Sequence, residues 1–147
     1  LADIAEQAAD KARALGQEPR VAFLSFSNFG NPMSHRAERL RNAVQMLDSR
    51  RVDFEYEGEM SADVALDTNM LALYPFGRLS GPANVLMMPD LHSANISAKL
   101  LQKLGGGVAI GPILNGLAKP IQIVQMSSGV TDLVNAAAFA AHEAIGR

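Results

Sequence analysis

The sequence contains no cysteine, which excludes disulfides, thiolate ligands for zinc and thiol nucleophiles. It also lacks an excess of either charge, because 13 basic and 15 acidic residues leave a net charge of −2. This balance argues against nucleic acid as a partner. With 48% hydrophobic and 19% charged residues, the 147-residue chain is instead typical of an ordinary soluble globular protein.

A signal peptide is also missing, since residues 1–15 have neither a basic start nor a continuous apolar core. Their apolar positions recur at helical spacing and predict an amphipathic helix. We therefore expect a cytoplasmic protein with no membrane partner. Because this helix begins without a methionine, we also expect the chain to be a fragment of a longer protein.

Strands and helices alternate along the rest of the chain. Short apolar or alternating segments predict strands at 21–27, 53–57, 83–88 and 121–124, with a further apolar run at 108–110. Helical periodicity predicts helices at 34–49, 61–73, 96–104 and 131–145. This alternation predicts an α/β class, with a three-layer, largely parallel sheet that carries helices on both faces, in a single domain over residues 1–147.

Ligands of such sheets bind outside the carboxyl ends of the strands, so the loops there are the candidate sites. The expected loops are 25–32, 58–63, 89–95 and 125–132. The first contains Ser27, Asn28 and Gly30, whose hydroxyl, amide and backbone N–H groups suit an anion. A plain turn between strand and helix is equally compatible with this composition.

Other polar residues have a functional and a structural interpretation. Glu57, Glu59 and Asp63 are candidates for acid–base or metal chemistry, but negative charge at a solvated helix start also explains them. Lys99 follows Asn95, the expected helix cap, by four residues; it is placed to reach an anionic ligand or simply to face solvent.

The three histidines, His35, His92 and His142, are far apart and have no spacing typical of metal ligands. We therefore expect no metal site in this chain. His92 follows Asp90 in an expected loop, where a structural hydrogen bond is its simplest role.

Five segments, taken in order, resemble the phosphotransacetylase (phosphate acetyl/butyryltransferase) family. They are LSFSNFG at 24–30, GEMSAD at 58–63, GPANVLMMPDL at 81–91, ANISAK at 94–99 and GPILNG at 111–116. The resemblance implies an isocitrate/isopropylmalate-dehydrogenase-like fold, of which this chain is the distal half. It also implies ligand-binding roles for matched positions, namely Ser27, Asn28, Gly30, Asn95, Lys99 and Asp132.

Two departures from active transferases concern positive charge. Phe29 stands where the family's first loop usually has lysine, and Met126 stands where the family has the catalytic arginine, although Asp132 keeps the aspartate position. A guanidinium can clamp a phosphate bidentately, whereas a thioether offers no donor. We therefore expect no catalytic residue in this chain and no efficient acetyl transfer by it.

Variant segments at 27–30, 74–79 and 91–95 resemble the C-terminal domains of large NADP-dependent malic enzymes. That resemblance implies a non-catalytic regulatory domain that binds acetyl-CoA as an allosteric inhibitor. It implies no cofactor in this fragment, and NADP and a divalent metal in an upstream malic-enzyme domain. The Ala-rich segment 136–144 is compatible with close packing in a homo-oligomer.

Two other functions remain open from the sequence. One is an active phosphate acetyltransferase, in which another arginine such as Arg78 clamps the phosphate. The other is a purely architectural module that joins copies of its host protein. Acetyl-CoA formation and acetyl-CoA binding distinguish these functions from the regulatory one.

Overall fold

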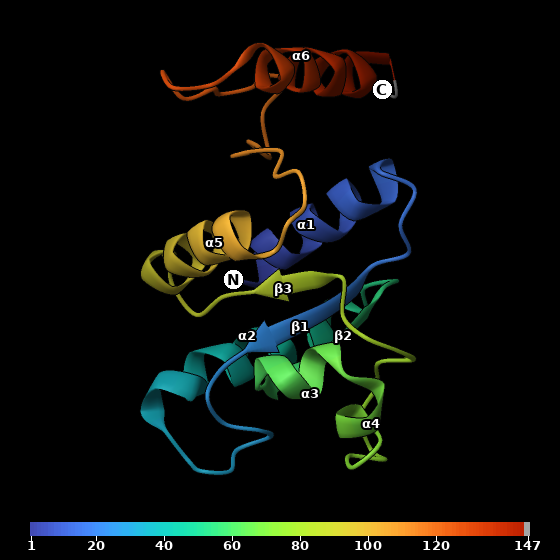
Figure 1. The fold of residues 1–147 in the computed structure, drawn as a ribbon. Coiled ribbons are helices and arrows are strands. Elements are labelled where there is room, and N and C mark those ends of the chain that lie inside the picture. The colour runs from blue at the N-terminus through green and yellow to red at the C-terminus, as the bar shows by residue number, and fades with distance from the viewer. Residues whose placement is uncertain (146–147) are drawn as a thin grey trace. The chain divides into compact units, whose positions relative to one another are not determined.

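The computed structural model describes residues 1–145 (Figure 1). In chain order, its elements are α1 (Ala2–Ala14), β1 (Arg20–Leu24), α2 (His35–Arg50), β2 (Glu55–Met60), α3 (Ala62–Leu66), α4 (Thr68–Leu71), β3 (Val85–Met87), α5 (Leu91–Leu104) and α6 (Val130–Ile145). They form two compact units, the first ending at Ser97 and the second starting at Ala98. The single domain expected from the sequence stays a prediction.

The first unit is built on a parallel sheet with the strand order β2-β1-β3. Val21 of β1 pairs with Tyr56 of β2 on one side and with Val85 of β3 on the other. Parallel neighbours require crossover connections, and the helices between these strands supply them. The predicted α/β class with a parallel sheet is therefore confirmed.

The central strand β1 is buried on both faces, which explains its continuous apolar run. Val21 and Phe23 pack in one cluster with Ala5 of α1 and Leu40 of α2. Ala22 and Leu24 point to the opposite face. There they pack in a second cluster with helices α3 and α4 and with the segment that leads to β3. Within the first unit, helices thus cover both faces of the sheet, as predicted.

Two predicted helices have different boundaries. The helix expected at 61–73 is two short helices, because Asp67 has extended backbone and its side chain accepts a hydrogen bond from the N–H of Asn69 to begin α4. The helix expected to start after Asn95 begins at Leu91 instead. Asp90 accepts from the N–H and the hydroxyl of Ser93 at 2.8 and 2.9 Å, so Asp90 does the capping that we assigned to Asn95.

The second unit has no strand among its described residues, so the strand predicted at 121–124 is wrong. Only an isolated bridge joins Ile113 and Gln122. A strand requires a neighbour that pairs along its length, and in the described chain no segment does so for 121–124. Helix α6 has one buried residue, Phe139, and its start matches the predicted helix to within a residue.

None of the helices in residues 1–145 has both the length and the apolar character needed to cross a membrane.

Candidate functional site

A cavity of about 650 Å³ opens in the first unit where β1 and β3 end. We call it the first cavity. Its lining residues are Leu24, Ser25, Phe26, Arg36, Arg39, Ala62, Met88, Pro89, Asp90, Ser93 and Ser97. This is the edge at which ligands of parallel α/β sheets bind, and the volume is that of a small-molecule site.

Two arginines of α2 provide the positive charge of the first cavity. Arg36 and Arg39 are exposed, and neither side chain has an ion pair in the part of the chain that the structure describes. Asp90 is the acidic residue of the lining, and hydrogen bonds from the Ser93 backbone N–H and hydroxyl hold its pKa below the usual range. Two guanidinium groups and one carboxylate leave the lining with a positive balance.

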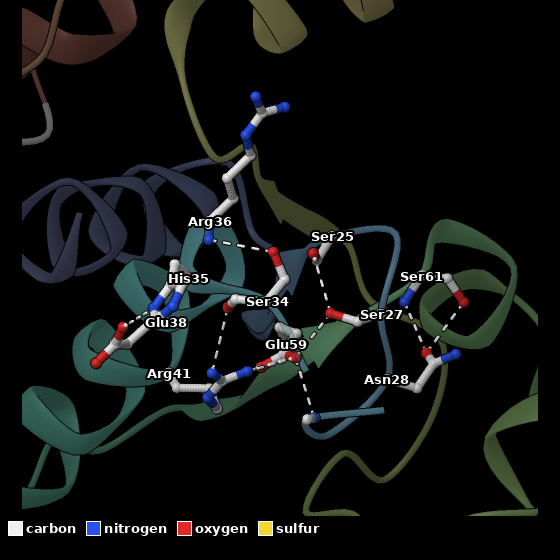
Figure 2. Close-up of polar contacts among 11 residues, drawn as sticks. Ser25, Ser27, Asn28, Ser34, His35, Arg36, Glu38, Arg41, Glu59 and Ser61 are labelled. Atoms are coloured by element: carbon white, nitrogen blue, oxygen red, sulfur yellow. Dashed lines mark hydrogen bonds and ion pairs between the residues drawn. The ribbon is translucent and has the colours of Figure 1, made fainter. Parts of the chain in front are cut away.

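The loop after β1 is held by the buried carboxylate of Glu59, whose side chain has no exposed surface (Figure 2). Its Oε1 accepts hydrogen bonds from the Ser27 hydroxyl at 2.7 Å and the Gly30 N–H at 3.0 Å. The guanidinium of Arg41 donates to both Glu59 oxygens, at 2.8 and 3.0 Å. The charge of Glu59 is thus balanced by Arg41, and its oxygens are occupied by groups of the protein. This carboxylate therefore anchors the loop and is not available as a general base.

Asn28 completes the anchoring of this loop. Its Oδ1 accepts from the N–H and the hydroxyl of Ser61, at 2.8 and 3.0 Å (Figure 2). The structure thus brings the predicted residues Ser27, Asn28 and Gly30 together, but each of them directs a polar group into the protein. The side-chain hydroxyl of Ser27 and the N–H of Gly30, which the sequence offers to an anion, are already bonded to Glu59.

Phe29, in the loop after β1, is part of an aromatic cluster. Its ring centroid lies 5.0 Å from that of Tyr74 and 4.9 Å from that of Phe76. Its backbone has a φ of 50°, and its N–H donates to the carbonyl of Glu59 at 2.7 Å. Phe29 is therefore held by aromatic packing and by one backbone hydrogen bond, and its side chain offers no charge to a ligand.

Arg78, the arginine considered as a substitute clamp, is engaged in structural contacts. Its Nη1 donates to Asp48 at 2.6 Å, its Nε and Nη2 donate to Glu57 at 3.2 and 3.1 Å, and its guanidinium carbon lies 4.6 Å from the ring centroid of Tyr56. Partial burial alone would lower the pKa of Arg78, but the hydrogen bonds and charges of Glu57 and Asp48 raise it above its ordinary value. This guanidinium has two carboxylate partners already and is poorly suited to bind a phosphate.

We expect Arg78→Met to lower the free energy of unfolding by about 1–3 kcal/mol, because the buried carboxylate of Glu57 loses its charged partner. The loss should fall in the lower part of that range, since the Arg78 side chain is 41% exposed and Glu57 keeps two backbone N–H donors. The matched control is Arg50→Met, because Arg50 pairs with Asp3 and Glu6 at the surface. Thermal unfolding of the two variants compares them; equal melting temperatures would contradict this account.

A second cavity, of about 320 Å³, lies in the second unit. Lys99 and Asp132 both line it, together with side chains that are mostly polar: Gln102, Lys103, Gln122, Gln125, Ser127, Ser128 and Asn135. Asp132 also accepts a hydrogen bond from the N–H of Gly129 at 3.0 Å. The structure thus joins two of the predicted site residues around one cavity.

Three other positions lie outside both cavities. Met126 is not among the lining residues, and its side chain is fully exposed. Asn95 lies on the exposed surface of α5 and lines neither cavity, and the same holds for His92. No group of three or more potential metal ligands occurs among residues 1–145.

The sequence did contain a signal for the residues that we missed. Arg36 and Arg39 are three apart on the helix that follows the first candidate loop, a spacing that puts both side chains on one side. Helical periodicity alone assigns both to the polar face of that helix, where arginines are common without a functional role. Arg41 of α2 and Glu59 of β2 are 18 residues apart in the sequence, and no local pattern predicts their contact.

Comparisons with known proteins identify relatives that share this parallel α/β structure. The family model "Phosphate acetyl/butaryl transferase" matches residues 1–141, so the chain belongs to this family. A solved phosphotransacetylase from Streptococcus pyogenes superimposes with a TM-score of 0.92 at 34% identity, over 99% of this chain and 45% of that one.

Among curated relatives, an NADP-dependent malic enzyme of Rhizobium meliloti is 60% identical over 98% of this chain, which spans 19% of that enzyme. The phosphate acetyltransferase of Clostridium acetobutylicum is 41% identical over 95% of this chain and is matched over 42% of its own length. The chain therefore spans about a fifth of the malic enzymes and less than half of the transferases. The predicted resemblance to the family and to malic-enzyme domains is confirmed.

Proposed function

We propose that this chain is a non-catalytic regulatory domain of an NADP-dependent malic enzyme and that it binds acetyl-CoA as an allosteric inhibitor. In this proposal the full-length protein decarboxylates malate oxidatively to pyruvate, and NADP and a divalent metal bind in its upstream catalytic domain. The 60% identity to a malic enzyme, over only a fifth of that enzyme's length, supports a domain of this kind.

The observation that carries the proposal is which residues line the second cavity. Lys99 and Asp132 line it, whereas Met126, at the position of the transferase arginine, points its thioether into solvent. Acyl transfer to or from phosphate moves negative charge onto the phosphate, and a missing preorganised donor typically costs on the order of a hundredfold in rate. No arginine is among the lining residues of this cavity. Recognition of an ester needs no such clamp.

We expect acetyl-CoA to inhibit malate oxidation by the full-length protein, and Lys99→Met to raise the concentration needed for half-maximal inhibition by about tenfold, as for the loss of one charge-assisted hydrogen bond. Lys119→Met is the matched control, since Lys119 is exposed and lines neither cavity. The readout is NADPH formation at a series of acetyl-CoA concentrations. Malate oxidation that is the same with and without acetyl-CoA would overturn the proposal.

The same preparation distinguishes the competing functions. Formation of acetyl-CoA from acetyl phosphate and CoA by the full-length protein would favour an active transferase. If calorimetric titration detects no binding of acetyl-CoA, the architectural function in a homo-oligomer is favoured instead.

A further inference from the structure

Three aromatic side chains meet at the surface of the first unit. The ring centroid of Phe29 lies 5.0 Å from that of Tyr74 and 4.9 Å from that of Phe76, and the last two are 6.0 Å apart, so each ring contacts the other two. Phe76 is 64% exposed, and Leu73, next to Tyr74 in the chain, is 68% exposed. We call these four residues the aromatic patch. None of them lines either cavity.

The aromatic patch is held in place by the chain's own backbone. The Phe29 N–H donates to the Glu59 carbonyl at 2.7 Å, and the Gly77 N–H closes a turn on the Tyr74 carbonyl at 2.8 Å. Arg78, directly after this turn, is fixed by two carboxylates. Large apolar side chains that are already ordered lose little conformational entropy on binding, which suits them to anchor an interface.

The chemistry of the aromatic patch specifies a protein surface with apolar side chains as its partner. The four side chains carry no charge, and the Tyr74 hydroxyl is the single polar group among them. The charge of the neighbouring Arg78 is balanced by Asp48 and Glu57. Aromatic residues are enriched at the centres of protein interfaces, where charged residues are depleted.

The size of the aromatic patch favours a partner within the same polypeptide. An aromatic side chain buries about 150–250 Å² in full, and two of these rings are already half-buried, so the patch offers on the order of 400 Å². A stable interface between separate proteins needs about 800 Å² on each partner, whereas domains of one chain bury as little as about 300 Å² on each side. A tethered partner also binds at a high effective concentration, so a small patch is sufficient.

The length of a malic-enzyme relative leaves room for such a partner. The chain spans 19% of the Rhizobium meliloti enzyme, so about four fifths of that polypeptide lies outside the match. The three rings of the aromatic patch come from the segments 27–30 and 74–79, two of those that resemble malic-enzyme domains.

We propose that the catalytic malic-enzyme domain of the same polypeptide docks on the aromatic patch. Phe76 and Leu73 supply most of the contact area, and Phe29 and Tyr74 hold the Phe76 ring in position. The identity of the docked domain rests on the proposed function, whereas the docking itself does not depend on acetyl-CoA.

The direct test replaces Phe76 in the full-length protein with p-benzoylphenylalanine, which cross-links to neighbouring C–H groups on illumination. We expect a cross-link to a peptide of the malic-enzyme domain, identified by mass spectrometry, in a product with the mass of one polypeptide. The same replacement of Phe26 is the matched control, because Phe26 is also 64% exposed but lines the first cavity. It should give no cross-link to the malic-enzyme domain.

Other cross-linking results would overturn the proposal. A product with the mass of two polypeptides would assign the aromatic patch to a second copy. A cross-link to the rest of the phosphotransacetylase-like module would assign it to the interior of that module. The proposal also fails if position 76 forms no cross-link, or if position 26 cross-links equally well to the malic-enzyme domain.

Phe76→Ser provides a second measurement in the full-length protein. The peptide identified by the cross-link should exchange its amide hydrogens about tenfold faster in this variant, as expected for the loss of an anchoring side chain. Phe26→Ser is the control and should leave that exchange unchanged. Unchanged thermal unfolding would show that Phe76→Ser folds, as expected for an exposed side chain. Equal exchange in the two variants would contradict the docking.

The docking and the regulation fail separately. A cross-link from position 76 to the malic-enzyme domain, together with malate oxidation that ignores acetyl-CoA, would refute the regulatory proposal and support this one. Inhibition by acetyl-CoA without such a cross-link would refute the docking and support the regulation.

Discussion

Glu59→Gln should lower the free energy of unfolding of the first unit by about 3 kcal/mol, because it removes one partner of a buried ion pair. The Arg41 cation would lose its counter-charge, and the amide would offer a single acceptor oxygen to Ser27, Gly30 and Arg41, which now share two. The loss should lie toward the lower end of the values seen for buried pairs, since the Arg41 side chain is 27% exposed.

The effect of Glu59→Gln should be largest in the loop after β1. Hydrogen–deuterium exchange of the full-length protein measures this locally, and we expect faster exchange at residues 27–31, where the amide of Gly30 is bonded to the Glu59 carboxylate. Glu38→Gln is the matched control, because Glu38 is exposed and, within residues 1–145, its side chain pairs with His35 alone, at 3.4 Å. Replacing both Glu59 and Arg41 with methionine should recover part of the loss. Exchange that Glu59→Gln leaves unchanged would refute the anchoring role.

Gly58→Ala should have an even larger effect, above about 4 kcal/mol, because an added Cβ has no room. It would lie 2.7 Å from the Cβ and 2.9 Å from the carbonyl oxygen of Phe23, and Gly58 has a φ of 151°, which disfavours a side chain. Phe23 cannot move away, since it is fully buried in the central strand of the sheet.

The expected result for Gly58→Ala is loss of soluble, folded protein, measured by soluble yield and by thermal unfolding followed by circular dichroism. Gly107→Ala serves as the control, because a Cβ at Gly107 meets nothing within 4 Å. If the two variants melt at the same temperature, the close approach of β2 to β1 does not limit stability.

Local patterns predicted the elements of the first unit well. The strand predicted at 21–27 is β1, which is buried on both faces but ends at Leu24, and the periodic segment after Ser34 is α2 with Ser34 as its cap. The start of α5 was wrong because two residues, Asp90 and Asn95, are both good caps, and only the backbone geometry decided between them. The strand at 121–124 was wrong because strand formation depends on a partner, which a local pattern cannot contain.

The candidate site was predicted in part. Lys99 and Asp132, matched by motif, do line one cavity, although 33 positions separate them in the sequence. Ser27 and Gly30 were predicted to offer donors to a ligand, but in the structure Glu59 accepts both. A motif identifies which residue types are present in a loop, whereas the use of their hydrogen bonds depends on side chains from other elements.

The alternation of apolar segments and the five ordered motifs are properties of the sequence, and they predicted the α/β class and the family correctly. The absence of cysteine likewise excluded disulfides and thiol chemistry without any structure. Only the tertiary structure decided which charges are available. It pairs Arg41 with Glu59 and Arg78 with Glu57 and leaves Arg36 and Arg39 at an open cavity. The physical reason is that a charge is neutralised by whatever lies within a few ångströms in space, and the fold brings those groups together from distant parts of the chain.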